Sequence, residues 1–421
     1  MENSVDQLCV GGNQMVRVNS FFSSAFARNS LDRLFGTLPN NGATKNVERL
    51  ARQVSRDIPK AGGFESLDLR TSGIHRDAIA KIEKSIGIIR SALGYDAQAS
   101  DEITYASGLK VTRRELHHKR YDEGVSSRFF LDVEGTQLAD QLKIISTGPR
   151  QVGVDGNGGN DTISIIGKTA QSVYGGQGGD DINLIVEDVS AVHGQEGADH
   201  LTVMAKSAGF INGGTGNDTF NIFADHVYSV HGDNRDGDGS DPVSSAVDAL
   251  NGQNDTMNIA ARAVSSIYAG AGNDTLNITA SSQLIEVDGG DGNDIISIVG
   301  NDVREINGGA GDDHIMINAK TSEEIRGGKG DDFITLLGTE ESSISFAKGD
   351  GRDLINISGV TTIVLEDGLR AEKATISREA NAIKVFFAAS NDTITLFHGY
   401  ADFDLGGPGV EIVSDGIIRI G

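Results

Sequence analysis

Apolar residues recur at constant offsets along the middle of the chain, and one aspartate marks each repeat. Relative to that aspartate, one apolar residue stands seven positions before it, and two more stand two and four positions after it. In the segment Thr275-Leu276-Asn277-Ile278 the apolar residues alternate with polar ones, which is typical of a short strand with one buried face. Each repeat therefore predicts two short strands, one after the aspartate and one ending just before the glycines that precede it.

The step between reference aspartates is 19 residues almost throughout. Two strands per step leave room only for tight turns, so we expect a mainly β fold, a right-handed parallel β-roll or β-solenoid with turns about 4.8 Å apart. No single turn can bury its own apolar face, so the stack should fold as a unit. The reference residues are Asp161, Asp180, Asp199, Asp218, Asp255, Asp274, Asp294, Asp313, Asp332 and Asp353.

Three parts follow from this pattern. Residues 129–360 are expected to form the roll, with Val133, Leu142 and Ile144 in a degenerate first turn that covers its end. Residues 361–421 lose the repeat and are expected to form a C-terminal β cap. Residues 1–128 are expected to hold a small α-helical region of unknown role, because 45–58 and 76–93 show helical spacing.

One repeat is interrupted. His231-Gly232 begins it and Leu250-Asn251-Gly252 resumes it, so residues 233–250 are predicted to be a loop insertion. The acidic run 233–241 leaves two interpretations, a further cation site and a solvated acidic loop. It lacks the EF-hand spacing, which favours the loop.

Charge and composition narrow the partners. The chain of 421 residues has 60 acidic against 36 basic residues and a net charge of −24, which argues against nucleic acid and suits cations. The single cysteine, Cys9, excludes an internal disulfide, so something else must hold an extracellular fold together. No stretch reaches the roughly 18 apolar residues of a membrane span, and residues 1–11 lack the pattern of a cleaved export signal, so we expect neither.

The loops before the aspartates are rich in glycine, as in Gly308-Gly309-Ala310-Gly311-Asp312-Asp313. Glycine tolerates positive φ and lets carbonyl oxygens turn inward beside the carboxylate. Ca²⁺ prefers such hard oxygen ligands in flexible geometry, whereas Mg²⁺ demands stricter order. The sequence therefore predicts several Ca²⁺ sites built from the ten reference aspartates and from Gly156, Gly175, Gly176, Gly178, Gly213, Gly214, Gly216, Gly270, Gly272, Gly289, Gly290, Gly292, Gly308, Gly309, Gly311, Gly327, Gly328 and Gly330.

These motifs resemble the RTX, or haemolysin-type calcium-binding, repeat, whose nonapeptide reads Gly-Gly-x-Gly-x-Asp-x-apolar-x. The resemblance covers Asp155 to about Ser358. It implies that Ca²⁺ lies between adjacent turns, and that the protein is secreted from a Gram-negative bacterium through the type I (ABC) secretion machinery. An uncleaved signal would then lie in residues 361–421.

The chain departs from the simplest form of that family, in which both edges of the roll carry the nonapeptide. Its alternate edge reads Ala205-Lys206-Ser207-Ala208-Gly209 in one repeat, without paired glycines or a constant aspartate. We therefore expect calcium loops on one edge only. Three loops are weaker than the rest: Gly194 to Asp199 lacks the second glycine, Gly349 to Asp353 contains Arg352, and Gly252-Gln253-Asn254 is all that remains before Asp255.

The alternative is a metal-free solenoid that uses Gly-Asn-Asp only as turn formers. Against it, stacked carboxylates about 4.8 Å apart repel by roughly 3 kcal/mol per neighbour at an effective dielectric near 20. The ion-free roll should therefore be unfolded or loose, so that calcium binding supplies folding energy. Calcium is scarce in the cytosol and abundant outside, so the chain is expected to fold after export.

Three functions remain open. The first is a non-enzymatic calcium-binding protein that acts in adhesion or in interaction with a cell-surface or host ligand. The second is a secreted enzyme or toxin effector whose activity lies in residues 1–128. The third, a pore-forming toxin of the same family, is disfavoured because no long apolar segment precedes the repeats. The segment Arg113 to Glu123 holds His117 and His118 but not the two-histidine spacing of a zinc protease, and no nucleophile elbow or phosphate loop is present, which favours binding.

Overall fold

A computed structural model describes residues 8–10, 14–16, 101–104, 110–119, 125–146, 151–233, 253–339, 341–379, 382–397, 410–414 and 416–420. The chain divides into two compact units, Met1–Asp68 and Leu69–Gly421. The described part of the first unit is an antiparallel pair of strands, β1 (Leu8–Val10) and β2 (Gln14–Val16).

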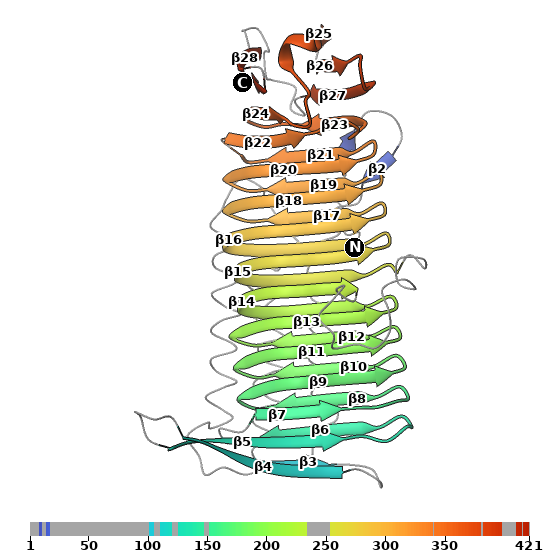
Figure 1. The fold of residues 1–421 in the computed structure, drawn as a ribbon, viewed down its shortest axis with the longest axis vertical. Helices are drawn as coiled ribbons and strands as arrows, with labels where there is room; N and C mark the ends of the chain where they lie inside the picture. Colours follow the sequence, from blue (N-terminus) through green and yellow to red (C-terminus); the bar gives the residue numbers. More distant parts are fainter. Residues whose placement is uncertain are drawn as a thin grey trace, which may run out of the picture. The chain divides into compact units, whose positions relative to one another are not determined.

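The second unit is built around a parallel β-solenoid of about 11 turns (Figure 1). Each turn places one strand on each of two faces, and each strand pairs in parallel with its equivalents in the turns before and after it. The partners of Asp181, for example, are Thr162 and His200, one repeat away in either direction. The predicted mainly β, parallel solenoid is thereby confirmed, and its right-handed sense stays a prediction.

The strands that follow the reference aspartates form one face. Its members are β6 (Gln141–Ser146), β8 (Thr162–Ile166), β10 (Asp181–Ile185), β12 (His200–Met204), β17 (Ile295–Val299), β19 (His314–Asn318), β21 (Phe333–Leu337) and β23 (Arg352–Asn356). Three longer strands continue round the bend onto the second face: β14 (Thr219–Asp233), β15 (Thr256–Ala271) and β16 (Thr275–Asp291).

The strands that lead into the glycine loops form the second face. They are β5 (Val125–Glu134), β7 (Gln151–Asp155), β9 (Thr169–Gln177), β11 (Asp188–Glu196), β13 (Ser207–Thr215), β18 (Asp302–Ala310), β20 (Thr321–Lys329), β22 (Glu341–Phe346) and β24 (Val360–Leu365).

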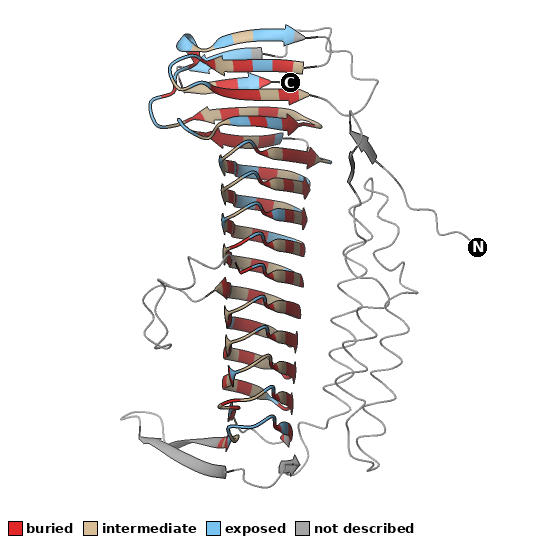
Figure 2. Ribbon diagram, turned by 90° about the vertical axis from the view of Figure 1, so that its right-hand side faces the viewer, coloured by how far each residue is buried: buried red, intermediate tan, exposed pale blue. Residues whose placement is uncertain are grey.

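The core lies between the two faces and consists of the apolar residues that the repeat predicts to point inward. Phe220 and Ile222, two and four residues after Asp218, are 0% exposed, as is Ile211 seven residues before it. Figure 2 shows buried residues in every turn of the roll. Because the same offsets are buried from one turn to the next, apolar side chains stack in continuous columns.

The edge opposite the glycine loops bends mainly through residues that carry side chains. One residue per turn there has positive φ, for example Ser172 at 57°, Phe210 at 52° and Glu305 at 56°. A left-handed backbone costs a residue with a side chain roughly 1–2 kcal/mol, and the pairing of strands on both sides of the bend must offset that cost.

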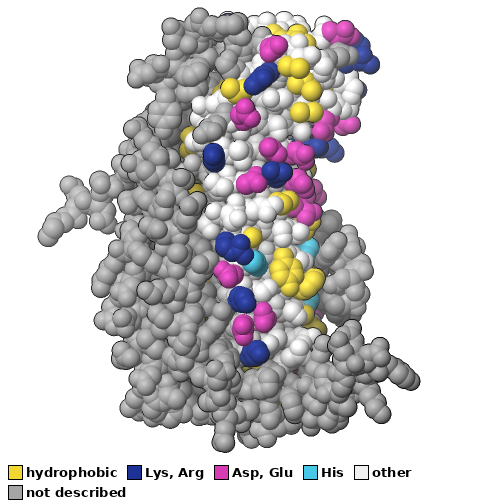
Figure 3. Space-filling view, turned by 90° about the vertical axis from the view of Figure 1, so that its left-hand side faces the viewer, with side chains coloured by type: hydrophobic (Ala, Val, Ile, Leu, Met, Phe, Trp, Pro, Cys, Tyr) yellow, Lys and Arg dark blue, Asp and Glu magenta, His cyan; other side chains and the backbone are white. Residues whose placement is uncertain are grey.

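Charges on this edge alternate in sign. The N–H of Glu187 donates to Lys168 O at 2.8 Å, that of Lys206 to Glu187 O at 2.8 Å, and that of Asp225 to Lys206 O at 3.1 Å, so these residues occupy equivalent places in consecutive turns. In Figure 3 basic and acidic side chains follow one another along this edge. The alternation belongs to these turns, since Glu286, Glu305 and Glu324 occupy equivalent places in three later turns of the same edge.

At its N-terminal end the roll begins with the predicted degenerate turn. Val133, Leu142 and Ile144 are all buried, in strands that pair with the first glycine-bearing turn. Two antiparallel strands, β3 (Asp101–Thr104) and β4 (Lys110–Lys119), pair with β6 and β5. The stretch around His117 is thus strand, and β5 runs across residues 128 and 129.

The helical segments expected at 45–58 and 76–93 lie outside the described residues. Among the residues that are described, the one helix is the short 3-10 helix η3 (Ala371–Lys373). None of the described helices is long and apolar enough to cross a membrane.

The C-terminal strands meet the last turn in both orientations. Three consecutive strands each pair antiparallel with the next: β25 (Thr375–Glu379), β26 (Ala382–Phe387) and β27 (Asp392–Phe397). The last of them, β27, also pairs in parallel with β23 of the roll. A hairpin of β28 (Val410–Ser414) and β29 (Ile417–Ile420) joins β24. Arg326 of the roll donates two hydrogen bonds of 2.7 Å to the Glu366 carboxylate beyond β24.

Two phenylalanines test the assignment of the core. We expect Phe220→Ala to lower the free energy of unfolding by about 3–5 kcal/mol, because it empties a fully buried position. The control Phe210→Ala removes a ring that is 56% exposed and touches Tyr228 edge to face, and should cost about 1 kcal/mol. Denaturant unfolding followed by far-UV circular dichroism measures both, and equal losses would contradict the inward placement of Phe220.

Candidate metal centre

The reference aspartates form a column along one edge of the roll, one in each turn. Every one of them lies at the start of a strand, directly after a glycine loop, and each is at most 3% exposed. Ten carboxyl groups are therefore removed from water in a single row. Burying an ionised carboxylate without a partner is costly, so each oxygen of the row needs to be accounted for.

One oxygen of each carboxylate joins its turn to the one before. The N–H of Asp161 donates to Asp180 Oδ1 at 2.7 Å, and the N–H of Asp180 donates to Asp199 Oδ1 at 2.7 Å. The same bond recurs along the column and lengthens to 3.3 Å only at its end, between Asp332 and Asp353. Oδ1 thus serves the backbone and holds neighbouring turns in register.

The other oxygen has no hydrogen-bond partner in nine of the ten. These buried Oδ2 atoms belong to Asp161, Asp180, Asp199, Asp218, Asp255, Asp274, Asp294, Asp313 and Asp332. A native protein rarely leaves a buried charged oxygen unpaired, and here the same atom is unpaired turn after turn. The repetition indicates that a proton or a cation completes each position.

Burial has already shifted these groups toward the protonated form. Desolvation, with repulsion from Asp218 and Asp180, raises the pKa of Asp199 to about 8. Desolvation and the neighbouring charge of Asp218 raise the pKa of Asp255 to about 9. Without a cation, a good part of the column therefore carries protons at neutral pH.

In most loops the first position is a glycine because oxygens of two turns lie too close to it to admit a side chain. A Cβ added to Gly175 would lie 2.6 Å from Gly194 O of the next turn, and closer still to Asp180 Oδ2. The φ of Gly175 is not positive, so the glycine is needed here for space. A carboxylate oxygen and a carbonyl oxygen from two turns thus converge beside this glycine, and both are of the hard oxygen type that Ca²⁺ prefers.

The second and fourth loop glycines turn further carbonyl oxygens toward the same space. Gly214 and Gly216 have φ of 110° and 132°, and a Cβ on either would collide with a carbonyl oxygen of the preceding turn, Gln195 O or Gly197 O. Each gap between turns thus offers carbonyl oxygens from both turns besides the carboxylate. An all-oxygen set with flexible geometry suits Ca²⁺ and excludes metals that favour nitrogen or sulfur.

Side chains alone would not supply enough ligands for a metal ion at this edge. Among the described residues, no group of three or more histidine, cysteine, aspartate or glutamate side chains is placed to hold a metal ion. That result agrees with the geometry, because most of the ligands would be backbone carbonyls. The predicted aspartates and glycines do come together at one edge, and the residues fit a calcium ion.

The structure also includes residues that the motif pattern left out. Gly194 and Gly232 show the same space, since a Cβ on either would meet the Oδ2 of its own turn and a carbonyl oxygen of the next. Gln195 takes the place of a second glycine with φ of 79°. For Gly194 and Gln195 the signal was their distance of five and four residues from Asp199, whereas the insertion separates Gly232 from Asp255. Ala269, by contrast, carries a methyl group where other turns have the first glycine.

The N-terminal end of the column is closed by a hydrogen bond. Asp140 occupies the reference position of the first turn, but its Oδ2 accepts hydrogen bonds from Thr136 N at 2.6 Å and Thr136 Oγ1 at 2.9 Å. The unpaired oxygens therefore begin only at Asp161. At the other end, Lys348 stands at the first-glycine position before Asp353.

The raised pKa values predict how pH acts on the cation-free roll. A carboxyl group whose pKa is raised on folding keeps its proton in the folded protein at a pH where the unfolded chain has released it. The free energy of unfolding therefore falls as the pH rises from about 4, the pKa in the unfolded chain, toward the folded pKa values of about 6–9. In excess chelator we expect more β signal by circular dichroism at about pH 5 than at about pH 8. Greater stability at the higher pH would contradict the burial of these carboxylates.

The space beside the first glycine can be tested by filling it. We expect Gly308→Ala to lower the free energy of unfolding by about 1–3 kcal/mol, because its methyl group would collide with Asp313 Oδ2 and Gly327 O. Gly416→Ala is the control, since the nearest atom to its Cβ is Leu365 O at 3.6 Å. If denaturant titration gives both variants the same stability, the space is not what the glycine provides.

Comparison with known proteins gives no relative for this chain: neither a protein-family model nor a curated protein matches it. Its resemblance to RTX repeats therefore rests on the loop motifs themselves.

Proposed function

We propose that this chain is a secreted calcium-binding protein of the RTX type, whose roll folds when Ca²⁺ binds outside the cell. One observation carries the proposal: nine buried Asp Oδ2 atoms lack a hydrogen-bond partner along one edge, beside carbonyl oxygens of neighbouring turns. A divalent cation bound to each of these oxygens would offset the negative charge of the row and supply the missing partner.

The gap between the turns of Asp294 and Asp313 illustrates the ligand set. Asp294 Oδ2 and Gly308 O both approach the position of a Cβ on Gly289. Carbonyl oxygens of Gly290 and Gly292 point into the same gap from the earlier turn, since they approach the Cβ positions of Gly309 and Gly311. Ca²⁺ accepts six to eight such oxygens with variable angles, whereas Mg²⁺ would need a stricter octahedron.

Folding and calcium binding are linked in this proposal. Without the ion, the column must either stay charged and repel itself or take up protons. With the ion, the binding free energy adds to the free energy of folding. A chain that stays loose where calcium is scarce and folds where it is abundant suits export through the type I machinery.

The rest of the proposal follows the RTX resemblance. Residues 361–421 would cap the last turn and carry the uncleaved export signal, and the folded protein would act by binding a cell-surface or host ligand. The support for a binding role is that the solenoid offers a long repetitive surface and that the chain carries no recognisable catalytic motif. Activity in residues 1–128 stays the alternative.

The experiment that tests the proposal is far-UV circular dichroism of the full chain, stripped with chelator and titrated with Ca²⁺ or Mg²⁺. We expect a cooperative rise of β signal with calcium and little with magnesium at the same concentration. A β signal already complete in excess chelator at about pH 8 would show that the loops are only turns, and the metal sites would have to be withdrawn.

A single substitution separates the two carboxylate oxygens. Asp313→Asn keeps an oxygen that can accept the N–H of Asp294 but puts an amide NH₂ in place of the unpaired oxygen. We expect this variant to bind one calcium ion fewer by equilibrium dialysis and to need more calcium to fold. Asp312→Asn, the same change at the exposed neighbour, should leave both quantities unaltered, and a loss as large as that of Asp313→Asn would contradict the assignment.

A further inference from the structure

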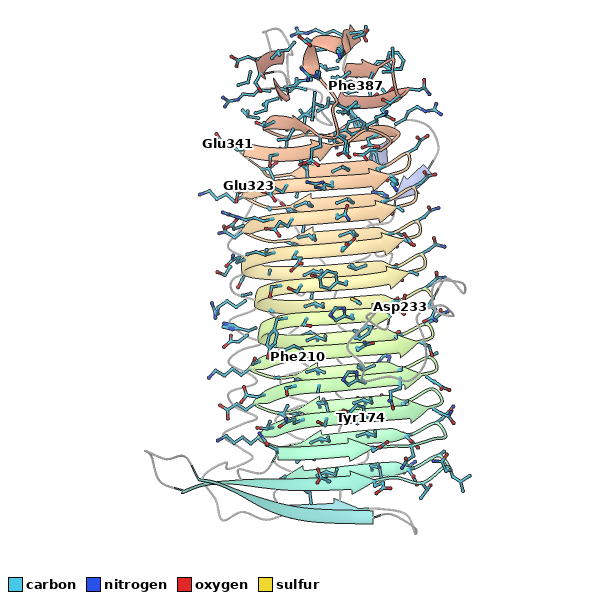
Figure 4. All side chains as sticks on the ribbon, in the orientation of Figure 1. Tyr174, Phe210, Asp233, Glu323, Glu341 and Phe387 are labelled. Atoms are coloured by element: carbon cyan, nitrogen blue, oxygen red, sulfur yellow. The ribbon has the colours of Figure 1, made fainter. Side chains whose placement is uncertain are left out.

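The chain leaves the roll within one of the glycine loops. The described residues stop at Asp233, the second position of the loop that begins at Gly232, and resume at Gln253, two residues before Asp255. Figure 4 shows Asp233 at the edge that carries the loops, opposite the edge of Phe210. In an uninterrupted loop, two backbone carbonyl oxygens at this place would accept hydrogen bonds from the loops of the neighbouring turns. An interruption is expected to remove both acceptors.

The first of these oxygens is replaced by Asp233 itself. In an intact pair of loops, Gln177 N donates to Asn157 O, the carbonyl oxygen of the second loop position in the preceding turn, at 3.0 Å. The equivalent donor above the interruption is Ala271 N. It donates instead to the Asp233 side chain, to Oδ2 at 2.6 Å.

The second oxygen is replaced by Gln253. In intact loops Gly178 N donates to Glu196 O at 2.8 Å, and Gly197 N donates to Thr215 O at 2.7 Å. The equivalent donor below the interruption, Gly216 N, donates to Gln253 Oε1 at 2.5 Å. Two side-chain oxygens thus stand where backbone carbonyl oxygens stand in every intact turn.

The two replacements differ in charge. The Gln253 amide is neutral, as a carbonyl is, but the Asp233 carboxylate adds a negative charge to the gap between the turns of Asp255 and Asp274. A Cβ on Gly270 would meet Asp233 Oδ2, where the corresponding Cβ on Gly309 would meet Gly290 O. The charge therefore lies at a position that a carbonyl oxygen occupies in other gaps.

The same gap holds the other parts of a cation site. Asp255 Oδ2 is buried without a partner, and it lies with Ala269 O beside the Cβ position of Gly232. Gln253 O points into the gap as well, since it approaches the Cβ position of Gly272.

We propose that Asp233 is a third carboxylate of the calcium site between Asp255 and Asp274, and that this site is the tightest of the column. The inference rests on the proposed calcium function. Affinity for Ca²⁺ rises with the number of charged ligands and with the rigidity of the site, and in this gap a carboxylate stands where the gap between Asp294 and Asp313 has the carbonyl oxygen of Gly290. The interruption of the repeat strengthens the metal site that it was expected to weaken.

The test is a calcium titration of the full chain against a chromophoric chelator, which resolves the tightest site. Asp233→Asn keeps an acceptor for Ala271 N and removes only the charge. We expect it to weaken the tightest dissociation constant by about 10-fold or more. The control Asp225→Asn removes one charge from the opposite edge and should leave that constant unchanged. Circular dichroism in saturating calcium checks that both variants fold.

A double variant locates the effect. If Asp233 and Asp255 hold the same ion, Asp233→Asn should change the tightest constant much less in an Asp255→Asn background than in the wild type. Equal tightest constants for Asp233→Asn and Asp225→Asn, or additive effects in the double variant, would overturn the inference while leaving the calcium function intact. Absence of calcium binding by the wild type would instead overturn the proposed function itself.

Discussion

The structure depends on one buried carboxylate in each turn. Its Oδ1 accepts the backbone N–H of the preceding aspartate, as between Asp161 and Asp180, and so sets the register of successive turns. Its Oδ2 is left unpaired by the same geometry. A single side chain therefore both orders the stack and leaves a buried oxygen that a cation or a proton would have to satisfy. In the proposed function, this would couple folding to ion binding without a separate sensor.

The chain reverses direction at the two edges of the roll with different kinds of residues. One edge uses glycine, with residues such as Gly214 at positive φ, and accumulates charge of a single sign. The other uses residues with side chains at positive φ, such as Ser172, and alternates Lys168, Glu187 and Lys206. In the proposed function, the acidic edge would need its counter-charge in order to form, whereas the other edge could form as the strands pair.

Much of this was accessible from the sequence, because a strand's buried face has a strict period. Offsets from the aspartates identified Phe220 and Ile211 as core residues, and paired glycines located the loops. The division of labour between Oδ1 and Oδ2 was not accessible, since it depends on a neighbour 19 residues away. Thr136, which satisfies Asp140, and Asp233, which replaces a carbonyl oxygen, likewise act across turns, where local motifs carry no signal.

The side-chain oxygens of Asp233 and Gln253 free the roll from backbone continuity at one loop. Elsewhere an added residue must be absorbed by a bulge, as between Ala261 and Ala263, or it displaces a strand. At this loop the side chains of Asp233 and Gln253 accept hydrogen bonds from the turns on either side, so we expect that the chain between them can be lengthened without shifting those turns. The position is an attachment point: a foreign peptide or a whole domain inserted there would be carried on the side of a rigid rod, at a known height along it.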